Sequence, residues 1–133
     1  MYTVTDKKLC EVYPGFSENK EKYKKRIEAV TDGYKKVFGN EETRIFTAPG
    51  RTEIGGNHTD HQHGCVLAAA VDLDILAAVA ENGTNKIRVL SDGYDMLEID
   101  LSDLKPMEEE KNTSAALIRG IAAKLAEMGY KIN

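Results

Sequence analysis

The sequence has few cysteines, no tryptophan and no long apolar run. Cys10 and Cys65 are too few and too far apart to indicate a disulfide scaffold or a zinc site. No apolar run reaches the roughly 18 residues of a membrane-spanning helix. The first residues lack the apolar segment of a secretion signal, so we expect a cytoplasmic protein with reduced thiols. Because Cys65 lies in an apolar run, we expect it to be a small buried side chain.

An excess of basic residues is also missing. Lys and Arg total 18 against 22 Asp and Glu, which gives a net charge of −4. The basic run from Lys20 to Arg26 fits the solvated face of a helix, so the charge pattern argues against a nucleic-acid partner. A length of 133 residues, with 41% apolar and 30% charged residues, predicts one globular domain over residues 1–133.

Two stretches have the apolar spacing of amphipathic helices. Residues 17–38 repeat an apolar side chain every three or four positions, and we expect Ser17 to cap this helix and Gly39 to follow its end. The second helix is expected to begin after a cap at Asn112 or Thr113. Its apolar stripe consists of Leu117, Ile118, Ile121, Leu125 and Met128.

Short apolar runs between these helices predict strands. Residues 44–47 are expected to form a strand that Pro49 and Gly50 cut off. Residues 65–71 and 74–80 are nearly all apolar, so we expect two strands that are buried on both faces. Two further strands, each preceded by a tight turn, are expected at 86–90 and 96–101. The pattern predicts an α+β fold, with a mixed, largely antiparallel sheet and helices packed on one side of it.

The densest chemistry lies in the segment TAPGRTEIGGNHTDHQHG, which runs from Thr47 to Gly64. Its glycines allow a backbone to take positive φ or to approach a ligand closely. Arg51 supplies a cation, and Asp60 supplies a carboxylate that can accept hydrogen bonds from two adjacent hydroxyls and so distinguish a sugar from its epimer. A segment of this kind between apolar strands predicts a small-molecule site. The glycines are Gly50, Gly55, Gly56 and Gly64.

The pattern APGRxxxGGxHTDxxxG resembles the N-terminal signature of the galactokinases, in the superfamily of galactose, homoserine, mevalonate and phosphomevalonate kinases. The apolar strand CVLAAAVDLDILAAV and the surrounding helices extend the resemblance over the whole chain, although only the signature is specific. The resemblance implies the ribosomal protein S5 domain 2-like fold of these kinases. It also implies a galactokinase that uses ATP and Mg²⁺ to phosphorylate the anomeric hydroxyl of galactose.

The same resemblance implies roles for four residues. Arg51 would be the catalytic-site cation near the anomeric hydroxyl and the γ-phosphate. Asp60 would bind the 3- and 4-hydroxyls of galactose, and His58 would contact the sugar near its 6-hydroxyl. Asn57 would bind there too, but most galactokinases have a glutamate at this position, which leaves open whether the sugar is galactose or a close derivative.

Two parts of the family pattern have no counterpart in the sequence: the glycine- and serine-rich loop that holds the nucleotide phosphates, and the catalytic aspartate. We therefore expect residues 1–133 to be the galactose-binding N-terminal part of a larger enzyme, with no ATP, Mg²⁺ or other metal bound and no activity by itself. Apolar strands without their usual cover also predict a homodimer or an exchange of elements between copies.

Two alternatives remain open. A non-catalytic galactose-binding or sensor module would carry the same signature, and the motif that distinguishes it from an enzyme would lie beyond Asn133. The spacing of His58, Asp60, His61 and His63 could also bind a divalent metal. Enzymes with a comparable pattern need additional histidines from distant loops, whereas this chain has three histidines, all in this segment.

Overall fold

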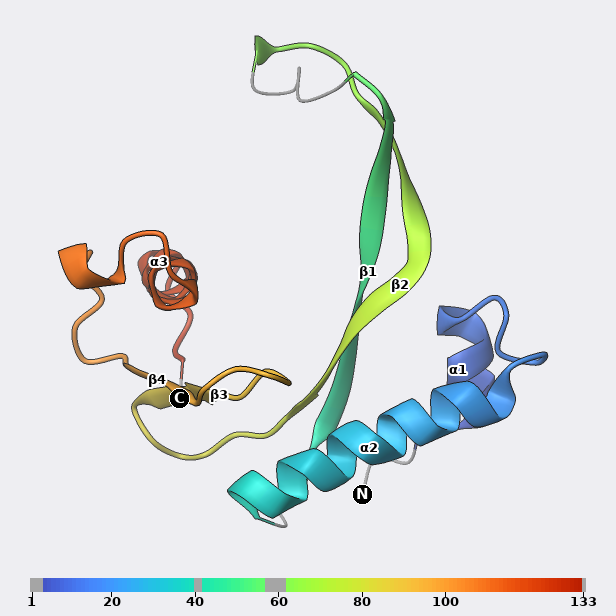
Figure 1. The fold of residues 1–133 in the computed structure, drawn as a ribbon. Coiled ribbons are helices and arrows are strands. Elements are labelled where there is room, and N and C mark those ends of the chain that lie inside the picture. Colours follow the sequence, from blue (N-terminus) through green and yellow to red (C-terminus); the bar gives the residue numbers. More distant parts are fainter. Residues whose placement is uncertain (1–3, 40–41, 57–61, 133) are drawn as a thin grey trace. The chain divides into compact units, whose positions relative to one another are not determined.

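The computed structural model of the protein describes residues 4–39, 42–56 and 62–132 (Figure 1). The chain divides into two compact units, Met1–Ala80 and Glu81–Asn133. Each unit combines helical segments with an antiparallel two-stranded sheet, which confirms the expected α+β class. The described strands form these two separate sheets instead of the single sheet that the sequence predicted.

The first unit begins with a short helix that the sequence analysis missed, α1 (Asp6–Val12). The longer helix α2 (Lys20–Phe38) starts three residues later than predicted, with Asn19 and not Ser17 at its N-cap. The chain before Asn19 forms a turn instead, and this turn places Phe16 in the core of the unit. Gly39 follows the end of α2, as expected.

The core of this unit is aromatic. Leu9 and Tyr13 from the region of α1 pack with Phe16 and with Tyr23 of α2, and Ile27 adds to the cluster from the next turn. The rings of Tyr13 and Tyr23 are stacked, with their centroids 4.3 Å apart. The expected apolar stripe of α2 is therefore buried mainly near the start of the helix.

A long antiparallel ribbon of β1 (Arg44–Gly55) and β2 (Leu67–Val79) completes the unit. The predicted end of the first strand at Thr47 was wrong, because β1 continues through Pro49 and Gly50. Proline lacks the N–H that would bond a second neighbouring strand, but β1 pairs only with β2 among the described strands, so the ladder tolerates it.

The prediction of two separate apolar strands was also wrong, because β2 is continuous. Its register with β1 shifts between Pro49 and Arg51, and this irregularity absorbs the residues that looked like a break. The strand is not buried on both faces either: Leu73 and Ile75 are 74% and 76% exposed. They alternate with Asp72 and Asp74, which contact the helical segments, so they lie on the opposite face of the strand. Figure 1 shows in addition that one end of the ribbon lies against α2 and the other extends away from both helices of the unit.

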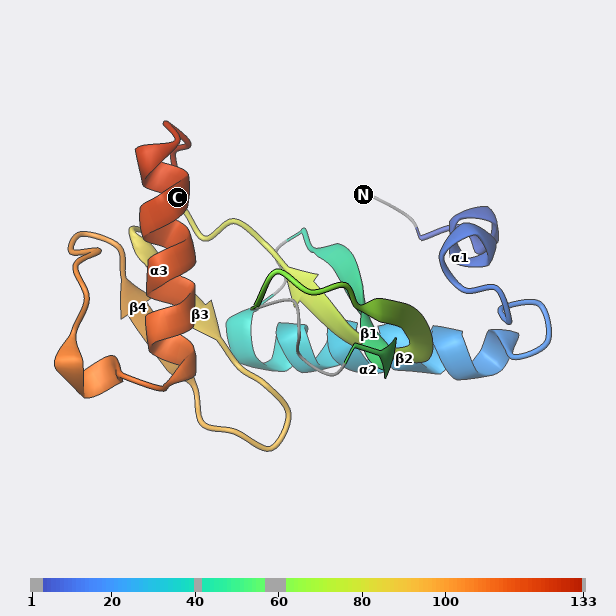
Figure 2. The same cartoon turned by 90° about the horizontal axis from the view of Figure 1, so that it is seen from above.

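The second unit is built on the ribbon of β3 (Lys86–Val89) and β4 (Leu97–Asp100), both close to their predicted positions. A 3₁₀ turn, η2 (Glu108–Glu110), leads to α3 (Ser114–Glu127), which packs against β4 (Figure 2). Thr113 caps this helix as predicted, since its Oγ1 accepts a hydrogen bond from the backbone N–H of Ala116 at 3.4 Å.

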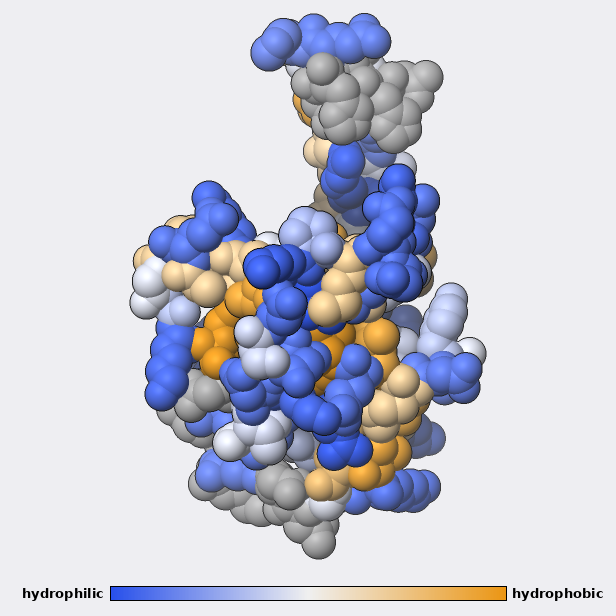
Figure 3. Space-filling model, turned by 90° about the vertical axis from the view of Figure 1, so that its left-hand side faces the viewer, coloured by the Kyte–Doolittle hydropathy of each residue, from blue (hydrophilic) through white to orange (hydrophobic). Residues whose placement is uncertain are grey.

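The predicted apolar stripe of α3 is largely on the wrong face. Ile118 packs against the core, but the other four members, Leu117, Ile121, Leu125 and Met128, are exposed. Figure 3 shows hydrophobic surface exposed among hydrophilic residues on the face that it draws. The buried face carries Ala115 and Ala122, which cover Ile99 and Leu101.

A buried arginine explains this choice of face. Arg119 points toward β4, and its guanidinium forms a two-point pair with the carboxylate of Glu110 at 2.6 and 2.7 Å. It also donates to the carbonyl oxygens of Asp100 and Asp103. The hydrogen bond from Arg119 lowers the pKa of the Glu110 carboxyl. This clamp ties α3, η2 and the end of β4 together, and it turns the larger apolar side chains outward.

None of the helices in the described part of the chain is long and apolar enough to cross a membrane.

Candidate functional site

The described part of the signature follows the outer half of the first ribbon. Thr47 to Gly55 belong to β1, and residues 62–66 lead back into β2. The register shift comes immediately before Arg51, which pairs with Ala70 of β2. The Arg51 side chain is 61% exposed, and its Nη1 lies 3.7 Å from Oε2 of Glu53. The guanidinium is therefore accessible to a ligand, beside the carboxylate two residues along the strand.

Just after β1 ends, the backbone at Gly56 lies close to the backbone of Cys65 and Val66, and we call this close approach the neck. Gly56 has a φ of +103°, and a Cβ on it would lie 2.6 Å from the carbonyl oxygen of Cys65 and 2.8 Å from Cα of Val66. A side chain at this position would meet both the strain of positive φ and a backbone clash. The positive φ expected at these glycines is thus present at Gly56, where the close neighbour is the opposing backbone. The expected approach to a ligand stays a prediction.

The other described glycines of β1 differ from Gly56. A Cβ on Gly50 would lie 3.1 Å from Cγ2 of Val71 and 3.2 Å from the carbonyl oxygen of Leu73, so the register shift packs closely against this residue. Gly55 faces open space, and the structure gives no reason for glycine there.

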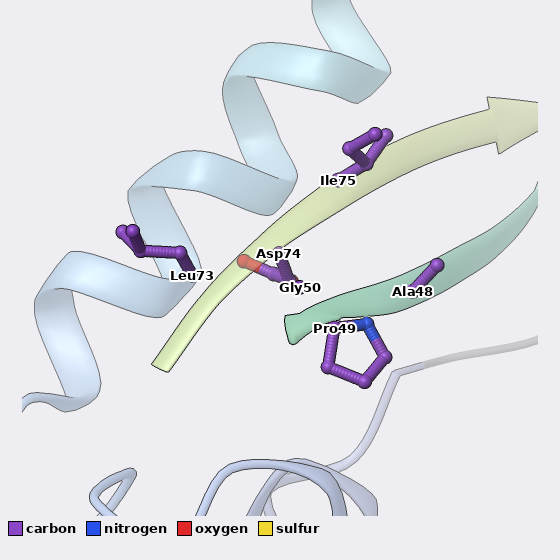
Figure 4. Close-up of a pocket in the computed structure, with 6 residues that line it drawn as sticks. All are labelled: Ala48, Pro49, Gly50, Leu73, Asp74 and Ile75. Atoms are coloured by element: carbon purple, nitrogen blue, oxygen red, sulfur yellow. The ribbon is translucent and has the colours of Figure 1, made fainter. Parts of the chain in front are cut away.

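A hollow of about 300 Å³ lies on the ribbon at the register shift, and its lining residue Gly50 directly precedes Arg51 in the chain (Figure 4). Its volume is at the lower end of the range of small-molecule sites. Because Leu73 and Ile75 on its wall are largely exposed, the hollow opens to solvent. Its lining residues are Ala48, Pro49, Gly50, Leu73, Asp74 and Ile75.

A second hollow, of about 440 Å³, lies between the helices and the opposite end of the ribbon. Its wall is mostly apolar, with Leu9, Ile45 and Leu76 among the lining residues, and Lys8 and Arg44 bring cations to it. This hollow contains no residue of the signature beyond Thr47.

The carboxylate of Asp74, on the wall of the first hollow, is the centre of a polar cluster that the sequence analysis missed. The hydroxyls of Tyr13 and Thr47 each donate to its Oδ2 at 2.5 Å. The guanidinium of Arg26 lies 2.7 Å from its Oδ1 and also donates to the Asp74 carbonyl oxygen at 3.3 Å. The Asp74 side chain is only 9% exposed. Burial by itself would raise the pKa of this carboxyl, but the hydrogen bonds and the ion pair outweigh burial and lower the pKa to about 2.

One signal in the sequence could have found this cluster. Asp74 is an ionisable residue in a strand that is otherwise nearly all apolar, and a carboxylate in such a place needs partners that offset its loss of water. No local pattern indicated that the partners would be Tyr13 and Arg26, because these residues lie about fifty to sixty positions away.

The remaining predicted site residues have different outcomes. Asn57, His58 and Asp60 lie outside the described residues, so their roles stay predictions. The same holds for His61, and hence for the metal-binding alternative.

Two residues after this gap are described. His63 is exposed, as a position at the rim of the segment implies, and has a φ of 60°. The prediction that Cys65 is buried was wrong, because the outer end of the ribbon has no cover in the described structure.

Comparison with known proteins gives a consistent result. Residues 32–81 match the family described as the galactokinase galactose-binding signature. The chain is 30% identical over 100 residues to the galactokinase of Lacticaseibacillus casei, covering 75% of this chain and 26% of the relative. It is 33% identical over 100 residues to the galactokinase of Bacillus subtilis, covering 72% and 25% of the two chains.

A solved structure agrees with these relatives. The galactokinase of Lactococcus lactis, determined in complex with galactose, has a TM-score of 0.70 and 25% sequence identity to this chain. The similarity covers 80% of this chain and 28% of that one. The chain thus spans about a quarter of the length of the curated relatives that it matches. Its signature, its relatives and its fold all match the N-terminal part of galactokinases.

Proposed function

We propose that this chain is the galactose-recognising part of a galactokinase, and that the complete protein transfers the γ-phosphate of ATP to the anomeric hydroxyl of galactose. One observation carries the proposal. The strand that holds the signature leaves the Arg51 side chain exposed and is followed by a neck at Gly56 where only glycine fits. In this proposal the protein is cytoplasmic, and residues 1–133 act as one domain.

Arg51 is the proposed catalytic-site cation. Phosphoryl transfer depends on positive charge near the transferring oxygens, and an exposed guanidinium can supply that charge without a covalent step. Asn57, His58 and Asp60 are the proposed sugar ligands. They follow the neck directly in the sequence, so Gly56 fixes where the segment that contains them begins.

In this proposal ATP and Mg²⁺ are cofactors of the complete protein. Thr113 occupies the first turn of α3 with its own side chain, which caps the helix. Within the described ranges, His, Cys, Asp and Glu form no group of three or more that could hold a metal ion. We therefore assign the nucleotide to parts of the complete protein that are not described here and derive no step through it.

The proposal is tested with the complete gene product, titrated with galactose and assayed for galactose 1-phosphate. We expect Asp60→Ala to weaken galactose binding by roughly 10- to 150-fold, because a charge-assisted hydrogen bond is lost. His63→Ala is the matched control and should change binding little. Equal losses in both variants would favour the metal site instead.

The same assay separates an enzyme from a sensor. Arg51→Ala should retain much of the galactose binding but lose phosphoryl transfer. Galactose binding without any turnover in the unaltered protein would identify a non-catalytic sensor, and absence of binding would refute both forms of the proposal.

Self-association of the 133-residue chain remains a prediction. The ribbon exposes apolar side chains, including Ile54, Leu73 and Ile75, and burial of such surface favours association. Sedimentation at micromolar concentrations should show a dimer, whereas a monomer at high concentration would contradict this expectation.

A further inference from the structure

The Asp74 cluster joins four segments of the first unit. Tyr13 immediately follows α1, Arg26 belongs to α2, and Thr47 and Asp74 belong to β1 and β2. The oxygens of the Tyr13 and Thr47 hydroxyls are 3.3 Å apart, so both bind the same side of the carboxylate. A single buried side chain thus connects both helical segments to both strands.

Neighbouring contacts reinforce the connection. The ring of Tyr13 stacks on Tyr23, and the hydroxyl of Tyr23 donates to Oδ1 of Asp72 at 3.4 Å. Two tyrosines therefore bind two carboxylates that are two residues apart on β2, and side chains with this spacing point to the same face of a strand. This face of β2 is the one that meets the helices.

The position of Asp74 along the ribbon is more telling than its contacts. Asp74 pairs with Pro49, the last position before the register shift, and Arg51 is the first paired residue after it. The cluster thus holds the ribbon just before Arg51, where the outer part of β1 begins. The outer part of the ribbon, from Arg51 to Gly55, continues away from the helices (Figure 1).

A two-stranded ribbon needs such a support. Two strands alone are marginally stable in water, so the direction of the outer part depends on what holds the inner part. The Asp74 carboxylate is nearly buried, and it is bound both by the helical segments and by the neighbouring strand β1. These contacts hold the ribbon in one orientation, because charge-assisted hydrogen bonds depend on geometry. Loss of Arg26 would leave the Asp74 carboxylate without its ion pair and with little access to water.

We propose that Asp74, with Arg26, Tyr13 and Thr47, is the positioning device of the signature, which sets the direction of the strand that carries Arg51. These are positioning residues, since they act through the ribbon. What the positioned strand binds rests on the proposed function, whereas the positioning itself does not.

The first experiment needs no ligand. Hydrogen exchange of the backbone amides is compared in the unaltered protein, Asp74→Asn and Tyr13→Phe, at a temperature where circular dichroism shows all three folded. Tyr13→Phe keeps the ring stack and removes only the hydroxyl, so it remains informative if Asp74→Asn unfolds. We expect exchange from Arg51 to Gly55 to accelerate about tenfold, although neither variant touches these residues.

The matched control is Glu110→Gln, which breaks a buried ion pair of the same type in the second unit. It should accelerate exchange in α3 and leave the signature strand unchanged. Unchanged exchange from Arg51 to Gly55 in the Asp74 and Tyr13 variants would overturn the proposal. An equal acceleration throughout the chain would overturn it too, because that is general destabilisation.

The second readout uses galactose and ATP with the complete gene product. Asp74→Asn should raise KM for galactose about tenfold and leave KM for ATP unchanged, and Thr47→Ser, which keeps the hydroxyl, should behave like the unaltered protein. An equal rise in both KM values would also count against positioning. Failure of galactose to bind the unaltered protein would refute the proposed function, while the exchange experiment would still decide whether Asp74 positions the strand.

Discussion

The two units contain similar elements but stabilise them differently. In Glu81–Asn133 the strands are short, and α3 covers Ile99 completely. In Met1–Ala80 the ribbon is long, and much of its apolar surface is exposed. The core of the first unit lies mainly between its helices, and polar contacts from Asp74 attach the ribbon to it. Under the proposed function, β1 presents side chains to a ligand, which requires that they stay exposed. Attachment of the ribbon to the helices through Asp74 leaves its outer part exposed in this way.

Each unit also has, among its described residues, an ion pair with one member that is at least nine-tenths buried. Arg119 and Glu110 lie among backbone carbonyls and connect neighbouring parts of a closed unit. Arg26 and Asp74 connect a helix to a strand that leaves the core. Because a buried ion pair often adds little net stability, its use is better judged by what it fixes in place. The Arg119–Glu110 pair holds α3, η2 and β4 together, and the Arg26–Asp74 pair orients the long ribbon of β1 and β2.

The largest expected effect tests the difference in burial. Ile99→Ala should destabilise the second unit by about 2–5 kcal/mol, because it opens a cavity around a side chain that is 0% exposed. Ile75→Ala, at an exposed position on the ribbon, is the matched control and should cost less than about 0.5 kcal/mol. Urea denaturation measures both values. Similar costs at the two positions would show that the ribbon is covered in solution.

The neck at Gly56 provides the next test. Gly56→Ala should cost about 1–3 kcal/mol or more, since positive φ and a clash with the Cys65–Val66 backbone act together. Gly55→Ala, beside it in open space, should be nearly neutral. Thermal unfolding of the two variants gives the comparison. If both tolerate alanine equally, the neck is wider than the structure shows.

The acid sensitivity of the first unit should come in part from Asp74. Its pKa is about 2 in the folded chain, below the value of about 3.9 of an unfolded aspartate. A lowered pKa in the folded state adds stability above the unfolded value, and this stability disappears as the pH falls from about 4 to 2.

We expect this contribution to be roughly 1–2 kcal/mol, because solvent at Arg26 screens the pair in part. Denaturation of the unaltered protein and of Asp74→Asn should therefore differ at pH 6 and converge near pH 2. Other carboxylates, such as Asp6, titrate in both proteins and cancel in the difference. A constant difference across this range would mean that Asp74 acts through packing alone.

The smallest effect concerns a helix cap in the second unit. Thr113→Ala removes the hydroxyl that accepts from Ala116 and should cost about 1 kcal/mol. Thr113→Ser keeps the hydroxyl and should cost little. A loss equal to that of Ile99→Ala would show that the second unit depends on its helix start as much as on its core.

Local chemistry accounts for what the sequence predicted correctly. The spacing of apolar residues identified α2, and the cap at Thr113 marked the start of α3, because both signals act within one or two helical turns. Alternating and turn residues located β3 and β4 for the same reason. The signature indicated the galactokinase relatives that the comparisons found, since its residues are contiguous in the chain.

Contacts distant in sequence decided the rest. The helix α2 begins at Lys20 and not near Ser17, because the turn before it packs Phe16 against Tyr23. The helix α3 turns its larger apolar residues outward because Arg119 binds Glu110 and two backbone carbonyls. Pro49 did not end β1, because that strand has one partner in the described sheet. The sequence by itself determined which segments can form helices, and it carries the signature that predicts a sugar site. Only the tertiary structure determined that Asp74, through Tyr13 and Arg26, holds the signature strand, because a buried carboxylate is stable only where partners from elsewhere in the chain meet it.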